Sequence, residues 1–385
     1  MDIEEFNIDG VTLYGDISIY GATYGGKVIY QILKRKGISI KCFYDRCKKG
    51  SVFCGLPVCD PKSISNEDSV IIALTRSFKS AYKFLKMEKD CKICRVTELI
   101  ENTGLDDIDY NFMEKEDILN FLNEYSFYSK DSEFSKEIFF PILEVFITEK
   151  CTLKCRDCSH LIPYYKDKRN YDIQEIIRDL ECVFKVIDKI YDLCILGGEP
   201  LMHPELYQLI DWLVEQPKIE KISIISNGTI IPSKRNLDSI KQSGTRIRIS
   251  DYREYSVNLN KLIEICEENN IVYFVNQESW VDMGKTEKHN YTENELKDMF
   301  LDCPFANAFL LLKGKLYRCP HIAHLDDLDI SGKNENDFVD FGRKEDSLTI
   351  KKRLVDFMNT DILYGCQFCN GIQNGKTIDA AIQMR

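Results

Sequence analysis

The sequence lacks three features that would place it in a membrane or on a polyanion. No apolar stretch approaches the roughly 20 residues that a membrane-spanning helix requires. The first ten residues, MDIEEFNIDG, are acidic and lack the basic and then apolar pattern of a signal peptide. The net charge is −11, whereas proteins that bind nucleic acid usually carry a basic surplus or stripe. These absences predict a soluble cytoplasmic protein whose partners include neither a membrane nor nucleic acid.

Cysteine, in contrast, is abundant. The chain of 385 residues contains 16 cysteines and is long enough for two or three domains. Without a secretion signal these thiols are expected in a reducing compartment, where they serve as metal ligands or free thiols more often than as disulfides. Seven of them form two groups, which are Cys151, Cys155 and Cys158, and then Cys303, Cys319, Cys366 and Cys369.

Residues 1–105 are predicted to form a small Rossmann-like domain. Segment 16–45 contains a β-branched strand, a glycine-rich turn at 21–26, an amphipathic helix and a second strand that ends in Asp45. Thr23 replaces the central glycine of the usual dinucleotide fingerprint. Two interpretations stay open. The turn binds a nucleotide or nucleotide-sugar with Asp45 on a ribose hydroxyl, or the domain serves only in docking or assembly.

The remainder of the chain alternates strands with helices. An acidic, aromatic-rich stretch at 106–138 is predicted to be a helical connector, and an apolar strand then leads into Cys151. From there strand patterns alternate with amphipathic helices, which predicts a parallel sheet that is covered by helices or curled into a barrel. Active residues of such folds lie at the C-terminal ends of the strands. The three clustered cysteines, Gly197–Gly198, Ser226–Asn227 and Ser250–Asp251 all occupy such positions.

The first cysteine group has three members within eight residues. Thiolates hold iron–sulfur clusters, and a 4Fe–4S cubane has four irons. Three protein ligands leave one iron open to a substrate or cofactor, just as catalytic zinc sites keep one position open. Zinc is less suitable, because a structural zinc site requires a fourth ligand and His160 has the wrong spacing from Cys158 for the usual zinc fingers.

The CxxxCxxC spacing of this group and the motif GGEP at 197–200 resemble the radical S-adenosylmethionine (SAM) superfamily. The resemblance covers the chain from about residue 141 onwards. It implies a partial (β/α)6 TIM-like barrel over 139–300 and a 4Fe–4S cluster whose open iron chelates the methionine part of SAM. Reduction of this cluster then splits the sulfonium and yields a 5′-deoxyadenosyl radical, which abstracts a hydrogen atom from the substrate. A reducing partner such as flavodoxin or ferredoxin is implied as well.

The resemblance also assigns the binding of SAM to particular residues. The carboxylate of Glu199 and the backbone of the double glycine are expected to bind the methionine ammonium, because an amine donates where a carboxylate accepts. Polar residues that end the third and fourth strands are expected to reach the ribose or the carboxylate. Asp157 stands where the family usually has an aromatic residue near adenine. The implied cofactor-binding residues are Gly197, Gly198, Glu199, Pro200, Ser226, Asn227 and Ser250.

The second cysteine group falls within residues 301–385. Its first two members flank a predicted hairpin with Gly314 in the turn, and the other two lie close together in GCQFCNG. The pattern resembles the SPASM and twitch extensions of the superfamily, and four cysteines match the shortened version with one auxiliary 4Fe–4S cluster. Such a fully ligated cluster is expected to carry an electron rather than to bind substrate. A zinc ribbon stays the alternative, since spacing alone does not separate the two.

Three further side chains are candidates for substrate chemistry. Cys194 precedes the double glycine and is either a hydrogen-atom donor to a product radical, as an epimerase requires, or a small buried apolar residue. Arg248 and Asp251 lie at or near a strand end and are candidates for holding a polar substrate. His321 and His324 follow Cys319 closely, where they contact substrate, tune the cluster or serve the local structure.

Three functions are compatible with these features. The first is a radical SAM oxidoreductase that oxidises, dehydrates or epimerises a small polar molecule such as a sugar, an aminocyclitol or a nucleotide-sugar. The second is a maturase of the SPASM type that modifies a ribosomal peptide, but the first hundred residues show a βαβ pattern rather than a winged helix that grips a leader. The third is a non-enzymatic iron–sulfur electron carrier, against which the open iron position argues.

Overall fold

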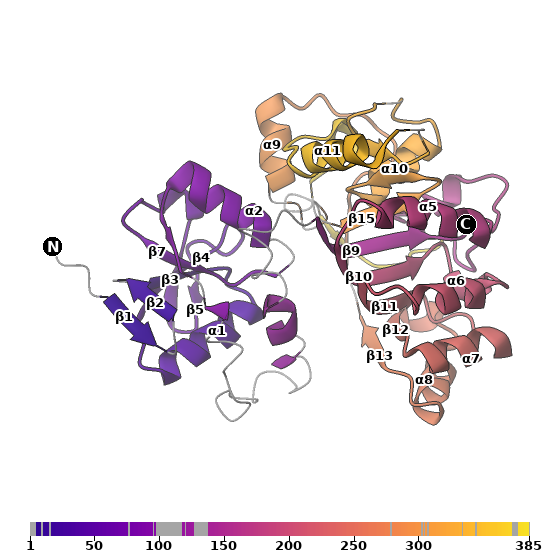
Figure 1. The fold of residues 1–385 in the computed structure, drawn as a ribbon, viewed down its shortest axis with the longest axis horizontal. Helices are drawn as coiled ribbons and strands as arrows, with labels where there is room; N and C mark the ends of the chain where they lie inside the picture. The colour runs from indigo at the N-terminus through magenta and orange to yellow at the C-terminus, as the bar shows by residue number, and fades with distance from the viewer. Residues whose placement is uncertain are drawn as a thin grey trace. The chain divides into compact units, whose positions relative to one another are not determined.

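The computed structural model divides into two compact units, residues 1–136 and 137–385, and each is described separately (Figure 1). Most of the predicted connector at 106–138 lies outside the described residues. Among these residues, no helix is both long enough and apolar enough to cross a bilayer. The structure describes residues 5–8, 11–14, 17–75, 78–94, 96–97, 118–119, 121–126, 138–277, 279–301, 303, 305, 308–332, 334–342, 345–371 and 376–384.

The N-terminal unit contains a six-stranded sheet of the Rossmann type. Its strands are β3 (Ile17–Tyr20), β4 (Ile40–Tyr44), β5 (Val52–Phe53), β6 (Leu56–Cys59), β7 (Ser69–Ile72) and β8 (Lys92–Ile93). They lie in the order β5-β6-β4-β3-β7-β8, and every pair except β5 with β6 is parallel. The five parallel strands have the order of doubly wound dinucleotide-binding folds. The predicted Rossmann-like fold is therefore confirmed.

The predicted first helix is α1 (Tyr24–Arg35). It begins at Thr23, whose hydroxyl accepts a hydrogen bond from the amide of Gly26 at 3.4 Å, and its apolar residues are buried. The other elements of this unit are the antiparallel strands β1 (Glu5–Ile8) and β2 (Val11–Tyr14), a 3-10 turn at Pro61–Ser63, and α2 (Phe78–Lys83), which continues into a π-helical turn at Phe84–Lys89.

The C-terminal unit is built on an eight-stranded sheet. Its first five strands are parallel and adjacent in chain order: β9 (Phe139–Phe146), β10 (Lys189–Leu196), β11 (Ile219–Ser226), β12 (Arg246–Ser250) and β13 (Tyr273–Asn276). Four helices alternate with them and stack along one side of the sheet (Figure 1): α5 (Ile173–Phe184), α6 (Leu206–Leu213), α7 (Lys234–Ser243) and α8 (Leu259–Glu268). This is the predicted partial barrel. Its described strands form an open sheet.

The sixth parallel strand comes from beyond residue 300. Strand β15 (Ala308–Leu312) pairs in parallel with β9, so it lies beside the first strand rather than after the fifth. A tight hairpin, in which Lys313 and Gly314 both have positive φ, connects it to β16 (Lys315–Tyr317). Strand β17 (Phe338–Asp340) completes the sheet on the other side of β16. The predicted hairpin between the first two cysteines of the second group is thus confirmed.

The remaining elements of this unit lie between and after these strands. They are β14 (Trp280–Val281), α9 (Glu293–Leu301), α10 (Pro320–Asp327), α11 (Ser347–Met358) and β18 (Thr377–Ile378), together with 3-10 turns at Ile162–Tyr164, Pro200–Met202, Arg253–Tyr255 and Tyr364–Phe368. Strands β14 and β18 pair antiparallel.

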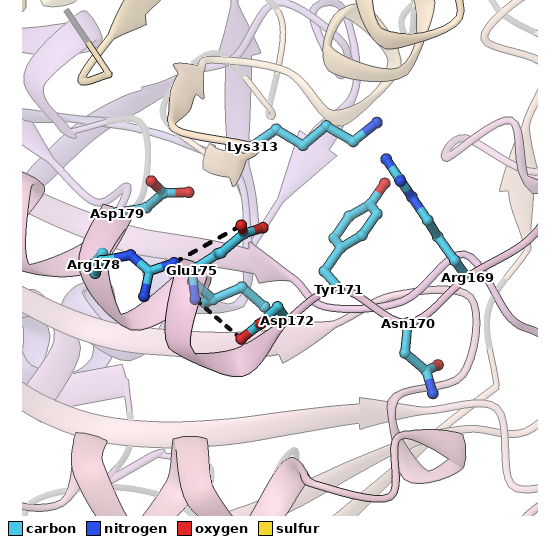
Figure 2. Close-up of a pocket in the computed structure, with 9 residues that line it drawn as sticks. Arg169, Asn170, Tyr171, Asp172, Glu175, Arg178, Asp179 and Lys313 are labelled. Atoms are coloured by element: carbon cyan, nitrogen blue, oxygen red, sulfur yellow. Dashed lines mark hydrogen bonds and ion pairs between the residues drawn. The ribbon is translucent and has the colours of Figure 1, made fainter.

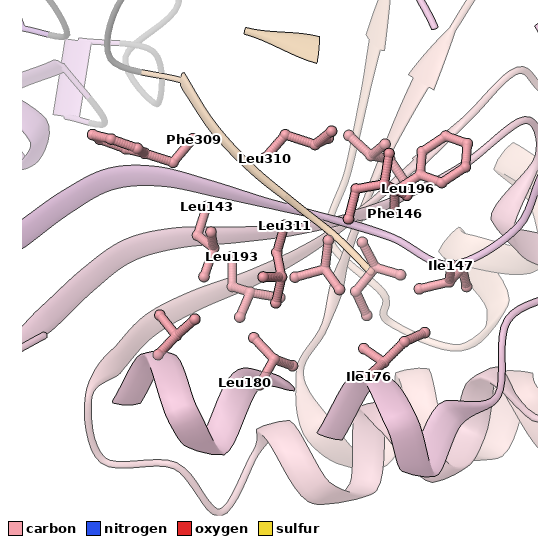
Figure 3. Close-up of a cluster of buried hydrophobic side chains, with 14 of the residues drawn as sticks. Leu143, Phe146, Ile147, Ile176, Leu180, Leu193, Leu196, Phe309, Leu310 and Leu311 are labelled. Carbon is pink, nitrogen blue, oxygen red and sulfur yellow. The ribbon is translucent and has the colours of Figure 1, made fainter. Parts of the chain in front are cut away.

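The main core lies between the sheet and helix α5 (Figure 3). Ile176 and Leu180 of α5 are one helical turn apart and face the strands, where they meet Leu143, Leu193 and Leu311. Leu143, Leu180 and Leu193 are fully buried. Asp172 caps the helix, because its carboxylate accepts hydrogen bonds from the amides two and three residues later.

Polar side chains gather on the opposite face of the same strands. Successive residues of a strand point to opposite faces, so Asp192, Ser223 and Arg246 point away from the apolar core. The hydroxyl of Ser223 donates to Asp192 at 2.8 Å, and a guanidinium nitrogen of Arg246 lies 3.1 Å from the same carboxylate. This polar inner face leads to the C-terminal ends of the strands.

Candidate functional site

A cavity of about 450 Å³ lies at the C-terminal ends of the barrel strands. Its walls combine the first cysteine group, the double glycine, the ends of β11 and β12 and the residues that follow β13. The predicted site residues that line it are Cys151, Cys155, Cys158, Gly197, Gly198, Ser226, Asn227, Arg248 and Ser250. Most of the site residues that were predicted from their positions at strand ends therefore line one cavity.

The three cysteines lie in one loop, and N–H groups from this loop and from two other segments point at the sulfur atoms of Cys151 and Cys155. The Sγ of Cys151 accepts from the amide of Leu153 at 3.4 Å and from the side chain of Asn227 at 3.5 Å. The Sγ of Cys155 accepts from the side chain of Gln383 at 3.4 Å. Such N–H donors favour anionic sulfur. The donor set of soft thiols with N–H groups aimed at sulfur fits an iron–sulfur cluster.

Burial controls the protonation of these thiols. It raises the pKa of Cys151 to about 12 and that of Cys155 to about 11, and it also raises the pKa of Cys158. Each thiol therefore keeps its proton until a metal displaces it. No three His, Cys, Asp or Glu side chains of the described residues converge closely enough to hold a single metal ion. A cubane requires less convergence, because each of its thiolates binds a different iron.

The double glycine lets the end of β10 approach the cysteine loop. The amides of Gly198 and Glu199 donate to the carbonyls of Thr148 and Lys150, both at 2.8 Å. A Cβ at position 198 would lie 2.5 Å from the Lys150 carbonyl oxygen and 2.7 Å from the Cβ of Cys151. Only glycine permits this approach, so the motif fixes the loop against the strand.

Glu199 is fully buried, and its carboxylate joins the ends of two strands. It accepts hydrogen bonds from the amide of Asn227 at 2.7 Å, the amide of Leu201 at 3.1 Å and the hydroxyl of Ser226 at 3.1 Å. Burial raises the pKa of Glu199 to about 7, although these donors act in the opposite direction. The carboxylate thus lies behind the cavity wall and holds Ser226 and Asn227 in that wall.

Arg248 brings a positive charge to the cavity. Its Nη1 lies 3.8 Å from the Sγ of Cys194 and 4.0 Å from a carboxylate oxygen of Asp192. Burial lowers the pKa of Arg248, but the neighbouring thiol and carboxylate more than offset this effect, and the net shift is upward. Cys194 is fully buried beneath Arg248. Asp251 lies in an adjacent hollow, where it accepts a hydrogen bond from Gln277 at 2.9 Å.

The second cysteine group also comes together in the structure. Cys319 and Cys366 are half-buried, and desolvation raises the pKa of both thiols, which the neighbouring thiols of the group raise further. The neighbouring Arg318 is a buried cation whose guanidinium donates to the carbonyls of Phe357 and Thr360 at 2.9 and 2.8 Å. Four thiols beside a buried cation suit an anionic cluster, because the cation compensates its charge.

One short segment separates the second cysteine group from the cavity. Met283 lines the cavity, and its carbonyl accepts a hydrogen bond from the amide of Asn370, the residue after Cys369, at 2.9 Å. Two residues later, Lys285 forms an ion pair with Asp157 of the first cysteine loop at 3.0 Å. Burial would raise the pKa of Asp157, but Lys285 and Arg156 lower it below its ordinary value. The segment therefore contacts both cysteine groups.

A chain of hydrogen bonds runs from the cavity to the exterior. His160 lines the cavity, and its Nδ1 lies 3.1 Å from the Nε2 of His324. Tyr165 follows, with its hydroxyl 2.7 Å from the Nδ1 of His324 and 2.8 Å from a carboxylate oxygen of Asp327. Asp327 in turn pairs with Lys313 at 2.6 Å. Burial lowers the pKa of His160 to about 4 and that of His324 well below its ordinary value, so both rings are neutral.

Lys313 belongs to a separate hollow of about 540 Å³ at the start of α5 (Figure 2). Several of its charged residues already have partners, some of them outside the hollow. Arg178 pairs with Glu175 at 3.8 Å, and Asp172 caps the helix. Asp179 lines the same hollow, and burial raises its pKa to about 6. None of the predicted cluster or SAM residues lines this hollow.

The predicted nucleotide turn of the N-terminal unit is occupied by its own side chains. Asp45 accepts hydrogen bonds from the amides of Ala22 at 3.0 Å, Cys47 at 2.9 Å and Lys48 at 3.1 Å, so it closes the turn. Phe121 packs against Gly25 at the start of α1. These contacts favour docking or assembly over nucleotide binding for this domain, and the choice stays a prediction.

Sequence reasoning missed several residues that line the cavity. Tyr252 and Asn276 follow or end strands, so the rule that selected Ser250 would have found them. Trp280, which meets the Tyr252 ring edge-on at 5.5 Å between centroids, lies in a segment without a periodic pattern. The missed residues are Glu144, His160, Tyr252, Asn276, Trp280, Met283 and Phe305.

Comparison with known sequences identifies the central part of the chain. Residues 145–250 match the family model of the Radical SAM superfamily. GTP 3′,8-cyclase of Clostridium perfringens (strain SM101 / Type A) is 27% identical in an alignment of 167 residues that covers 38% of this chain and 48% of that protein. The GTP 3′,8-cyclase of Stenotrophomonas maltophilia (strain K279a) is 32% identical over 99 residues, which are 25% and 29% of the two chains. The chain thus spans about half or less of the length of these curated relatives.

Two solved structures show a distant likeness to this chain. The BtrN complex with AdoMet and 2-DOIA aligns with a TM-score of 0.33 and 16% identity over 64% of this chain and 100% of that chain. SuiB of Streptococcus suis bound to the precursor peptide SuiA aligns with a TM-score of 0.34 and 15% identity over 76% and 83%. TM-scores this low do not establish a shared fold, so the architecture rests on the strand order described above.

Proposed function

Because residues 145–250 belong to the Radical SAM superfamily, we propose that this protein is a radical SAM enzyme that oxidises a small polar molecule. One observation supports this proposal most directly. The cavity contains the three-cysteine loop, and one of its walls, at Met283, is hydrogen-bonded to the segment that carries the second cysteine group. A site of radical generation and a site of electron storage would then flank the same substrate.

The first cysteine loop is the proposed cluster site. Cys151, Cys155 and Cys158 would hold a 4Fe–4S cluster that leaves one iron for SAM, and the bound pair supplies a 5′-deoxyadenosyl radical. The protein's own part is to orient SAM and exclude water. Ser226 and Asn227 present polar groups to the cavity, and the carboxylate of Glu199 holds both in place.

Aromatic residues offer a surface for adenine. Asp157 is bound to Lys285 and Arg156, so it does not take the role of the aromatic residue usual at that position. Tyr252 and Trp280 line the same cavity and pack against one another. We assign adenine to this pair, since stacked or edge-on aromatic contacts suit a flat base.

The polar floor of the cavity suits a small hydrophilic substrate. Arg248 and Glu144 both line it, and they place opposite charges within reach of a substrate that carries hydroxyl, amine or acidic groups. The cavity of about 450 Å³ must also admit SAM, which favours a small substrate over a large one. A sugar, an aminocyclitol or a nucleotide-sugar fits these requirements better than a ribosomal peptide.

Oxidation of such a substrate removes two hydrogens. One leaves as a hydrogen atom and converts the radical to 5′-deoxyadenosine, and the other leaves as a proton together with one electron. Cys303, Cys319, Cys366 and Cys369 would hold a second cluster, which would supply an acceptor for that electron. The neutral imidazole of His160 lies in the cavity wall as a hydrogen-bonding group.

Anaerobic incubation of the reconstituted protein with SAM and dithionite tests the proposal. We expect about eight irons per chain from two cubanes, and formation of 5′-deoxyadenosine that increases with a small polar substrate. The Cys155→Ser variant should abolish 5′-deoxyadenosine, whereas Cys182→Ser, which changes a cysteine outside both groups, should not. Absence of 5′-deoxyadenosine from the fully loaded protein would overturn the enzyme assignment. If the protein modified a ribosomal peptide but turned over no small molecule, peptide maturation would replace small-molecule oxidation as the proposed function.

A further inference from the structure

A segment more than 200 residues away in the chain covers the first cysteine loop. Residues 376–384, here named the clasp segment, pair with the wall of the cavity through β18 and β14. Farther along, the amide of Arg156 donates to the carbonyl of Ile382 at 2.7 Å, and the amide of Met384 donates to the carbonyl of Lys154 at 2.8 Å. The cysteine loop is thus held on one side by the barrel and on the other by the clasp segment.

The clasp segment contributes one side chain directly to a cluster ligand. The Nε2 of Gln383 donates to the Sγ of Cys155 at 3.4 Å and to the carbonyl of Ala381 at 2.6 Å. Its Oε1 accepts from the amide of Lys154 at 2.7 Å. The backbone N–H of Lys154 and the carbonyl of Ala381 together fix which end of the amide is oxygen and which is nitrogen. The N–H group therefore points at sulfur.

The sulfur end of this contact is buried, whereas Gln383 itself is half-buried. Ala381 is fully buried, and it packs with Leu153 and Cys155 in a small apolar cluster of its own. A hydrogen bond in such partly buried surroundings is screened less by solvent than one in open water. The contact joins two segments that lie more than 200 residues apart in the chain. It therefore depends on the tertiary fold and not on the cysteine motif.

We propose that Gln383 sets the reduction potential of the cluster held by the first cysteine group. The inference rests on the proposed function only in assuming a 4Fe–4S cluster at Cys151, Cys155 and Cys158. Addition of one electron from a low-potential carrier makes the cluster sulfurs more negative, and the carrier is oxidised by one electron. The Gln383 N–H stabilises this added charge, because hydrogen bonds to the sulfurs tune cluster potentials. Gln383 is therefore a positioning and tuning residue, not a catalytic one.

Redox titration of three variants tests the role of Gln383. Gln383→Leu removes the donor at similar volume, and Gln383→Glu replaces the donor with negative charge. The control is Gln216→Leu, because Gln216 makes its side-chain hydrogen bond to Trp212 at the end of α6, outside the cavity. All are made in a Cys366→Ser, Cys369→Ser background, so that only the first cluster is observed.

We expect all variants to load about four irons at the first site. At the solution potential where the control is half reduced, the ratio of reduced to oxidised cluster in Gln383→Leu should be about tenfold lower, which corresponds to a potential about 59 mV lower for a one-electron couple. Gln383→Glu should shift further in the same direction. An unchanged potential in Gln383→Leu, or a shift to higher potential, would overturn the proposal.

If the variants lose the cluster, a measurement on the protein with unsubstituted Gln383 tests whether its side chain donates a hydrogen bond to the cluster. In protein whose glutamine side chains alone carry ¹⁵N, the reduced cluster should show a nitrogen hyperfine coupling from Nε2. Absence of this coupling would overturn the proposal. The outcome is separable from the proposed function. If the potential shifts but the protein forms no 5′-deoxyadenosine, the role of Gln383 is supported and the proposed enzyme activity is refuted. If 5′-deoxyadenosine forms normally but the potential is unchanged, the enzyme activity is supported and the role of Gln383 is refuted.

Discussion

At the scale of single residues, Glu199 shows how a motif residue can act from behind the site. Its carboxylate accepts hydrogen bonds from Leu201, Ser226 and Asn227, so it links the turn after β10 to the end of β11. The sequence located this residue because the GGEP motif follows a strand. It could not reveal which way the carboxylate points, since that depends on donors 27 and 28 positions away.

We expect SAM to bind more weakly below pH 7 than above it. The pKa of Glu199 is raised to about 7, so the carboxyl gains a proton as the pH falls from 8 to 6. The protonated form accepts fewer hydrogen bonds, and the wall formed by Ser226 and Asn227 loosens. Equilibrium dialysis of SAM under anaerobic conditions should show a loss of affinity of up to about tenfold per pH unit below 7.

The Glu199→Gln variant is the control for this pH dependence. It does not titrate and presents an amide nitrogen to one of the donors, so its affinity should be low at every pH. Glu205→Gln, on a neighbouring turn, should bind SAM as the unsubstituted protein does. A pH dependence in Glu199→Gln as steep as in the unsubstituted protein would assign the effect to another group.

Cys194 gives a second prediction at this scale. The thiol is fully buried beneath Arg248, so we expect Cys194→Ala to retain both 5′-deoxyadenosine formation and substrate oxidation within about twofold. Liquid chromatography with mass spectrometry measures both products from one reaction. If the thiol donated a hydrogen atom to a product radical, the variant would still form 5′-deoxyadenosine but no product. That outcome would indicate an epimerase.

At the scale of elements, the sequence predicted what local periodicity controls. Strands β9 to β13 and helices α1 and α5 follow apolar spacing, and Asp172 marks the start of α5. The placement of β15 beside β9 and the clasp of residues 376–384 over the cysteine loop depend on pairing between distant segments. Such pairing leaves no periodic signal, so the sequence could not predict it.

Helix α5 and the β15–β16 turn meet at Asp179, which gives a prediction about stability. Burial raises its pKa to about 6, although the amide of Gly314 acts to lower it. The folded pKa lies above the unfolded value, so stability from this group is present at low pH and is lost as the pH rises through about 6. Asp179→Asn should therefore stabilise the protein at pH 8 by about 1 kcal/mol, a figure reduced for solvent screening at this partly exposed site.

Thermal unfolding of the cluster-loaded protein under argon measures this difference. The gain should be present at pH 8 and vanish near pH 4, where the carboxyl of the unsubstituted protein is protonated. Asp211→Asn on the exposed surface of α6 is the matched control and should change stability little at either pH. An equal gain at both pH values would mean that the Asp179→Asn substitution stabilises by packing rather than by removal of charge.

At the scale of the whole molecule, the chain combines a Rossmann-like unit with a unit that carries both cysteine groups. The N-terminal unit closes its own glycine turn with Asp45 and Phe121, which favours a role in docking or assembly. Within the C-terminal unit, the barrel and the segment beyond residue 300 share one sheet through β9 and β15. Both cysteine groups thus belong to the unit built on this sheet, although different elements supply their ligands.

This division of ligands predicts that the two proposed clusters can be lost separately. Cys366 and Cys369 belong to the 3-10 turn at Tyr364–Phe368 and its end, far in sequence from the first cysteine loop. The double variant Cys366→Ser, Cys369→Ser should fall from about eight irons to about four per chain. It should still form 5′-deoxyadenosine, because the first loop and its contacts with Asn227 and Gln383 remain.

Substrate oxidation should fall by at least about tenfold, because the electron that remains after hydrogen abstraction loses its acceptor. Iron analysis and product quantification on the same sample measure both effects. Full oxidation by a protein with four irons would show that the second cysteine group serves the structure and not the reaction.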